Sequence, residues 1–190
     1  MKKTILCVAM LALLVSAPAA FAGDLGLYGS YWDTDALGET GGAGAKFAFG
    51  DGPVQFELRA TYYPDISEEI GQLIDDGTGD FELEATVPEL GVTFDFGPSD
   101  SFRPYAGGGV SYYLLSTNRF DTEDEVGFYG VLGAEFGPDS GRVGFYVEGA
   151  YRWVEATVKN EDDIDEIDLA DEVKIDLNGP TVNAGVVFRF

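Results

Sequence analysis

The last ten residues of the chain, TVNAGVVFRF at 181–190, constrain its fold more than any other stretch. Side chains alternate between the two faces of an extended strand, so one face carries Val182, Ala184, Val186, Phe188 and Phe190. That face is entirely apolar and ends in a terminal aromatic residue. Chain ends of soluble domains are usually polar and poorly ordered. The pattern therefore predicts a terminal β-strand with one face against an apolar environment.

Residues 1–22 have the pattern of a secretory signal peptide. Two lysines precede an apolar run at 5–15, and the sequence AFA at 20–22 has the A-x-A form of a cleavage site. The run is shorter than the roughly 20 residues that a spanning helix needs. We expect cleavage after this segment and a single domain over residues 23–190. Cys7, the only cysteine, lies in the predicted signal peptide, so we expect neither a disulfide nor a thiolate metal site in the domain.

The composition limits the classes of partner and of fold. The formal net charge is −23, and such a chain will not bind nucleic acid non-specifically, because phosphate binding needs Lys and Arg. A hydrophobic content of 45% and an aromatic content of 14% argue against disorder. Beyond the signal peptide, no uninterrupted apolar run approaches the length of a spanning helix. If the chain crosses a membrane, it does so with strands of about 9–11 residues each.

Eight segments show alternating hydrophobicity, and the gaps between them are alternately long and short. The segments are 25–31, 43–49, 54–63, 81–96, 102–115, 126–136, 143–158 and 181–190. The short gaps are rich in Gly, Pro, Asp and Ser, which are turn residues. We therefore expect three short turns at one end of the sheet and four long loops at the other. In segment 81–96 the apolar parity changes at Pro88, which predicts a β-bulge.

An even number of strands, with short turns at one end and long loops at the other, is typical of transmembrane barrels. Residues 23–190 resemble the small eight-stranded outer-membrane barrels of the OmpA and OmpX type, and Val186, Phe188 and Phe190 resemble their terminal assembly signal. The resemblance implies an all-β, closed up-and-down antiparallel barrel in the outer membrane of a Gram-negative-type bacterium, reached after export to the periplasm. It implies periplasmic turns, extracellular loops, contact with outer-membrane lipid and lipopolysaccharide, and the barrel-assembly machinery as a partner during biogenesis. We expect a monomer.

The strand face opposite the apolar one carries charges of both signs in near balance. Its predicted members are Lys46, Arg59, Arg103, Arg142, Arg152 and Arg189, with Glu57, Glu89, Asp95, Glu135 and Glu148. A low-dielectric interior tolerates charge only when it is paired and hydrogen-bonded. We therefore predict a charge network in the lumen of the barrel, with glycines such as Gly133 and Gly144 leaving room for long Arg and Tyr side chains.

Aromatic residues near the ends of the segments predict two interfacial girdles, where bulky and amphipathic rings lie at the level of the lipid headgroups. The outer girdle is predicted to contain Tyr31, Tyr62, Tyr112, Tyr151 and Trp153. The inner girdle is predicted to contain Phe49, Phe96, Phe102, Phe136, Phe188 and Phe190.

Most of the 34 acidic residues fall in the four long gaps. The simplest interpretation is solvated, repulsive loop charge. The alternative is a loosely bound Ca²⁺ or Mg²⁺ that bridges to lipopolysaccharide phosphates. Positions one, three, five and twelve of a calcium loop are matched by Glu161, Asp163, Asp165 and Glu172, but Glu166 stands at position six, where Gly is needed. This excludes an EF-hand and leaves a loose cation site; no other cofactor is expected.

The last long gap has alternating apolar residues at both of its ends. Ala156 and Val158 alternate after Trp153, and Val173, Ile175 and Leu177 alternate before Gly179 and Pro180. The pattern fits either a two-stranded ribbon that projects beyond the bilayer or an ordinary loop. By resemblance to OmpX-type barrels, a ribbon would favour contact with other surfaces by strand addition.

The chain contains no histidine. Outer-membrane barrel enzymes resemble one another in using a histidine as base or orienter, so we expect no enzymatic activity. The leading hypothesis is a structural or surface-interaction role, in adhesion or envelope integrity, because an eight-stranded interior is just wide enough to be filled by side chains. The first alternative is a narrow channel for small solutes or ions. The second is a soluble lipocalin-like barrel whose apolar face points inward.

Overall fold

The structure is a computed structural model of the chain. It describes residues 23–34, 38–50, 52–64, 66, 83–97, 101–117, 124–137, 142–159 and 172–190. The predicted signal peptide lies outside these residues. In the described part of the chain, no helix is long and apolar enough to cross a membrane.

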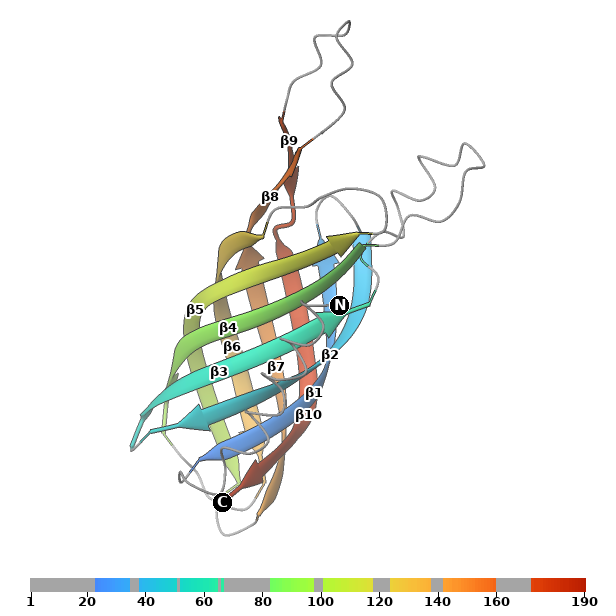
Figure 1. Cartoon of the computed structure of the whole chain (residues 1–190). Coiled ribbons are helices and arrows are strands. Elements are labelled where there is room, and N and C mark those ends of the chain that lie inside the picture. Colours follow the sequence, from blue (N-terminus) through green and yellow to red (C-terminus); the bar gives the residue numbers. More distant parts are fainter. Residues whose placement is uncertain are drawn as a thin grey trace, which may run out of the picture.

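Eight strands form a closed antiparallel barrel (Figure 1). They are β1 (Asp24–Thr34), β2 (Gly38–Phe49), β3 (Val54–Tyr63), β4 (Leu83–Asp95), β5 (Phe102–Thr117), β6 (Glu125–Phe136), β7 (Val143–Trp153) and β10 (Gly179–Arg189). The order around the barrel is β1-β10-β7-β6-β5-β4-β3-β2. The first and last strands pair with each other, from Asp24 opposite Arg189 to Trp32 opposite Thr181. This closure leaves the barrel without an edge and confirms the predicted fold class.

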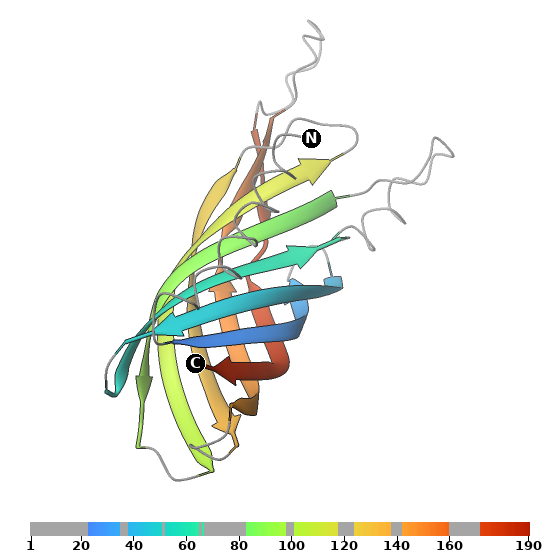
Figure 2. The same cartoon turned by 60° about the horizontal axis from the view of Figure 1, so that its bottom comes forward.

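A separate two-stranded ribbon continues beyond one end of the barrel (Figures 1 and 2). It consists of β8 (Glu155–Lys159) and β9 (Glu172–Asp176), which pair in antiparallel fashion. Only Val154 separates β7 from β8, so the predicted single strand over 143–158 is in fact two strands. The ribbon, which the sequence left open against an ordinary loop, is present over these residues. We call this end of the barrel the ribbon end.

The opposite end carries the C-terminus and the short connections, and we call it the turn end (Figure 1). Gly52, between β2 and β3, has φ of +81°, and Gly97, after β4, has φ of +120°. Glycine adopts positive φ without the steric cost that a Cβ would add. The turn residues predicted from the sequence therefore give the sharp reversals at this end.

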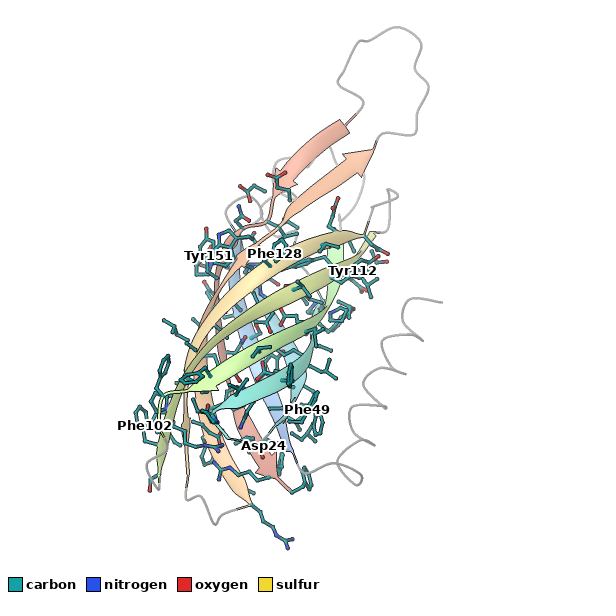
Figure 3. All side chains as sticks on the ribbon, turned by 90° about the vertical axis from the view of Figure 1, so that its left-hand side faces the viewer. Asp24, Phe49, Phe102, Tyr112, Phe128 and Tyr151 are labelled. Atoms are coloured by element: carbon teal, nitrogen blue, oxygen red, sulfur yellow. The ribbon has the colours of Figure 1, made fainter. Side chains whose placement is uncertain are left out.

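The two faces of the barrel wall differ in polarity as predicted. Leu132 and Phe145 point outward with 68% and 63% of their surface exposed, whereas Glu148 points inward and is 1% exposed. The soluble lipocalin-like alternative is therefore wrong, because the apolar face is outside and the charged face is inside. Figure 3 shows Tyr112 and Tyr151 toward the ribbon end and Phe49 and Phe102 toward the turn end, as the two girdles require.

The bulge predicted at Pro88 is absent. Pairing of β4 with β5 keeps one register on both sides of this residue, from Leu83 opposite Thr117 to Asp95 opposite Tyr105. The inward face simply changes character along the strand: Glu89 points inward, and so do the buried Val87 and Ala85 nearer the ribbon end. The apolar parity changes because the inward residues change from polar to apolar toward the ribbon end. The register of the strand is unbroken.

Candidate functional site: the barrel lumen

The centre of the lumen is organised around the carboxylate of Glu148 on β7. Arg59 on β3 donates from Nη1 to Oε2 at 2.7 Å and from Nη2 to Oε1 at 2.9 Å. The Tyr105 hydroxyl donates to Oε1 at 2.6 Å, and Lys46 Nζ donates to the same oxygen. Asn183 Nδ2 donates to Oε2 at 3.3 Å. This buried carboxylate therefore has a full set of donors, as a charge in a low-dielectric interior requires.

Glu57 completes this central cluster and balances its charge. Its carboxylate accepts a hydrogen bond from Arg59 Nε and lies 3.6 Å from Lys46 Nζ. Lys46 and Arg59 are direct cross-strand partners, an arrangement of like charges that is unfavourable without counter-charges. Lys46 Nζ also lies 3.8 Å from the ring centroid of Tyr146, within the range of a cation–π contact. Two acids and two bases thus make a neutral cluster whose members are all buried.

A second ion pair lies closer to the ribbon end. Arg152 Nη1 donates to Glu89 Oε1 at 2.6 Å, and Arg152 Nε donates to Thr181 Oγ1 at 3.1 Å. Ser111 donates to the same Glu89 oxygen at 3.3 Å. The Arg152 guanidinium also lies 5.7 Å from the ring centroid of Trp32. This pair is the boundary between the polar and the apolar parts of the lumen.

At the turn end, Glu135 joins two arginines. Arg103 Nη2 donates to Glu135 at 2.7 Å, and Arg189 donates to its other oxygen. Arg103 also lies 3.6 Å from Asp24. Asp95 is half-buried beside these groups and helps to line a cavity of about 20 Å³, which has room for roughly one water molecule.

One residue of the predicted network lies elsewhere, and one member was missed. Arg142 is exposed in the turn before β7, where its carbonyl accepts a hydrogen bond from the Arg189 amide at 2.9 Å. Its predicted lumen position is wrong because β7 begins one residue later, so strand alternation does not apply to Arg142. Asp24 was missed, although it shares inward parity with the buried Gly26 and Tyr28.

The ribbon end of the lumen is filled by apolar side chains that the sequence analysis did not identify. We call this cluster the apolar plug; it contains Trp32, Tyr63, Ile66, Ala85, Val87, Tyr113, Leu115, Val154 and Leu177, all buried. Trp32 is 0% exposed, and its ring centroid lies 5.2 Å from that of Tyr63 and 5.9 Å from that of Tyr113. Arg152 Nη1 also donates to the Tyr113 hydroxyl at 3.4 Å, so the plug lies directly against the Arg152–Glu89 pair.

Inward glycines make room for the large inward side chains, as predicted. Tyr105 lies directly opposite Gly133, and a Cβ added at Gly133 would be 2.5 Å from Tyr105 Cζ. A Cβ at Gly144 would be 3.0 Å from Arg189 Nη2. Tyrosine over glycine on the neighbouring strand is thus one way in which this narrow lumen is filled.

The predicted assembly signal lies on the outer face at the turn end. Val186 and Phe188 are opposite Leu27 and Leu25 of β1. Phe190 follows β10 with 64% of its surface exposed. The structure therefore leaves the terminal ring accessible from outside the barrel.

Most of the predicted cation site falls outside the described residues. This applies to Glu161, Asp163 and Asp165, while Glu172 is the first residue of β9. Across the residues that the structure describes, no group of three or more acidic, histidine or cysteine side chains is placed to hold a metal ion.

Several solved structures share this fold. OprG from Pseudomonas aeruginosa superimposes with a TM-score of 0.62 at 19% identity, over 90% of this chain and 97% of that one. Neisserial surface protein A gives a TM-score of 0.61 at 12% identity, over 88% and 97%. The N-terminal barrel of OprF from Pseudomonas aeruginosa gives 0.50 at 12% identity, over 88% and 99%. At these identities the likeness shows the fold alone.

Curated protein sequences contain no significant match to this chain. The family model described as the outer membrane protein beta-barrel domain matches residues 5–190. The match covers nearly the whole chain and agrees with the closed eight-stranded barrel and its outward apolar face. The chain therefore belongs to the outer membrane protein beta-barrel domain family and is a protein of the Gram-negative outer membrane.

Proposed function

We propose that this barrel is a closed, non-enzymatic membrane anchor with a structural or surface-interaction role. The observation that carries the proposal is the apolar plug, which fills the ribbon end of the lumen with buried side chains, Trp32 among them. A barrel closed in this way acts through its outer surface and its projecting parts. The lumen carboxylates of Glu57 and Glu148 are held in ion pairs, and the chain has no histidine, which supports a non-enzymatic role.

The ribbon end is the extracellular end in this proposal. Short turns and the C-terminus lie together at the other end, which in transmembrane barrels faces the periplasm. The ribbon then projects from the cell surface, where the outer edges of β8 and β9 have no further strand beside them in the described sheet. Free strand edges are suited to pairing with an extended segment of another chain.

The partner that fits this surface best is a positively charged protein segment. Most of the chain's acidic residues fall in the predicted loops at this end, so an approaching basic partner is attracted over several ångströms. Such attraction is reduced by salt, because the Debye length falls to about 3 Å at 1 M ionic strength. The outward apolar face and its girdles are proposed to contact outer-membrane lipid and lipopolysaccharide.

A narrow channel is the competing function. An ion that crosses this lumen would have to separate Arg59 from Glu148 and also displace Trp32. Each step leaves a buried charge without its partner or opens a packed apolar cluster, and both cost several kcal/mol. The closed arrangement of the lumen therefore favours the anchor over the channel.

Surface binding tests the proposed role directly. We would compare the barrel in lipid nanodiscs with a variant in which residues 156–175 are replaced by Asn-Gly, a sequence suited to a two-residue hairpin turn. The expected result is salt-sensitive binding to an immobilised lysine-rich polypeptide that the shortened variant loses while it keeps the heat-modifiable migration of a folded barrel. Equal binding by both folded proteins would contradict a role for the ribbon.

A further inference from the structure

We propose that the ribbon controls the apolar plug: displacement of β8 and β9 moves Val154 and Leu177 out of the lumen and opens its ribbon end. The inference rests on the proposed closed lumen. It goes further, because it makes closure of the lumen depend on the position of the ribbon. It predicts that a partner bound to the ribbon changes access to the lumen.

The connection between ribbon and barrel is short on both sides. Val154 alone joins β7 to β8, and Leu177 with Asn178 joins β9 to β10. β7 and β10 are neighbouring strands of the barrel wall. The ribbon is therefore a direct continuation of two paired strands, with no flexible linker in which its movement would be lost.

The junction residues are themselves part of the plug. Val154 is 4% exposed and Leu177 is 1% exposed, and both belong to the cluster that contains Trp32. The Leu177 amide donates to the Val154 carbonyl at 3.1 Å, and the Val154 amide donates to Asn178 Oδ1 at 2.7 Å. These two bonds fix the junction, so a tilt of the ribbon acts on the two side chains that close the lumen.

The coupling extends one step further into the barrel. Arg152 of β7 lies two residues before Val154, and it donates to Glu89. Its Nε also binds Thr181 on β10, the other strand that continues into the ribbon. A Cβ added at Gly179 would clash with the Asp33 carbonyl, so β10 lies close to β1, which carries Trp32, on this side of the junction. Ribbon, plug and ion pair thus form one connected unit.

Trp32 reports the state of the plug. The chain has two tryptophans, and the other, Trp153, points outward. In a Cys7→Ser/Trp153→Phe background, acrylamide quenching of Trp32 measures how often the plug opens in the folded barrel. The conductance of the same protein tests the proposed closed lumen independently.

Two changes to the ribbon act in opposite directions. Thr157→Pro/Val158→Pro removes at least one ribbon hydrogen bond, because successive amides of a strand point to opposite sides and proline has none. Glu155→Cys/Asp176→Cys places a disulfide between direct cross-strand partners at the base of the ribbon. We expect the proline variant to raise the Trp32 quenching constant several-fold, and the oxidised cysteine variant to quench less than its reduced form.

The matched control is a clamp at the same end of the barrel but away from the ribbon. Glu84→Cys/Ser116→Cys joins exposed cross-strand partners on β4 and β5, and its oxidation is expected to leave Trp32 quenching unchanged. Equal quenching in the oxidised and reduced forms of the ribbon clamp would overturn the coupling, whether or not the proline variant folds. An equal effect of both clamps would overturn it too, since closure would then follow from general stiffening.

Discussion

Arg59 and Glu148 form a two-point ion pair that spans the full width of the barrel. The two hydrogen bonds measure 2.7 and 2.9 Å, and the strands that carry these residues, β3 and β7, are diametrically opposed in the strand order. Backbone pairing in the wall, by contrast, connects only neighbouring strands. This pair therefore braces the barrel across its lumen. It occupies the central space through which a solute would have to pass.

Removal of one partner is expected to cost more than removal of both. Glu148→Gln leaves Arg59 and Lys46 with Glu57 as their nearest counter-charge, and the loss of one partner of a buried pair costs about 3–5 kcal/mol. Arg59→Met/Glu148→Gln restores charge balance and should recover much of that loss. Urea unfolding in lipid vesicles measures both, with Arg142→Met in the exposed turn as a control expected within about 0.5 kcal/mol of the parent.

The plug should depend on the ring of Trp32 and very little on its N–H group. Within the described part of the chain, Trp32 Nε1 has no hydrogen-bond partner. Trp32→Ala is expected to lower the free energy of unfolding by about 3–5 kcal/mol, whereas Trp32→Phe keeps an aromatic ring and should cost less than about 1.5 kcal/mol. A similar cost for both substitutions in urea unfolding would contradict the expectation that an aromatic ring at this position is enough.

Two glycines on neighbouring strands should respond differently to a methyl group. A Cβ at Gly133 would clash with Tyr105, whereas a Cβ at Gly149 meets nothing within 4 Å. We expect Gly133→Ala to destabilise the folded barrel by about 1–3 kcal/mol through overpacking, and Gly149→Ala to be neutral or slightly stabilising. If both alanine variants unfold at the parent's urea concentration, the tight packing of Tyr105 over Gly133 is not present in the membrane.

Phe190 is expected to matter for assembly and not for the finished barrel. Its ring is largely exposed, and its amide donates to the Gly23 carbonyl at 3.3 Å. Deletion of Phe190 should lower the amount of folded protein in the outer membrane several-fold, while the protein refolded in vitro keeps nearly the parent stability. Normal membrane levels of the deletion variant would contradict the assembly-signal interpretation of Val186, Phe188 and Phe190.

Strand alternation predicted which residues face lipid and which face the lumen, because successive side chains of a strand point to opposite faces of the barrel wall. It placed Arg59, Glu57 and Glu148 inside from sequence alone. It failed for Arg142, since alternation has no meaning outside the strand. Alternation could not predict which charges pair across the lumen, because Arg59 and Glu148 meet only when the sheet closes.

The apolar plug shows a second limit of the sequence pattern. The rule that apolar residues face lipid and polar residues face the lumen holds for the middle of the barrel but not for the ribbon end. The change of apolar parity at Pro88 therefore predicts a bulge, although Val87 and Ala85 continue the inward face without interruption. The inward parity of Trp32, Tyr63 and Tyr113 is the sequence signal that could have predicted this apolar cluster.

Single-barrel conductance in a planar lipid bilayer tests the closed lumen most directly. The wild-type barrel is expected to insert without resolved openings over the voltage range in which the bilayer itself is stable. Resolved openings of the wild type, changed in amplitude by Arg59→Met/Glu148→Gln and unchanged by Arg142→Met, would show that ions pass the Arg59–Glu148 pair, and they would contradict the closed anchor.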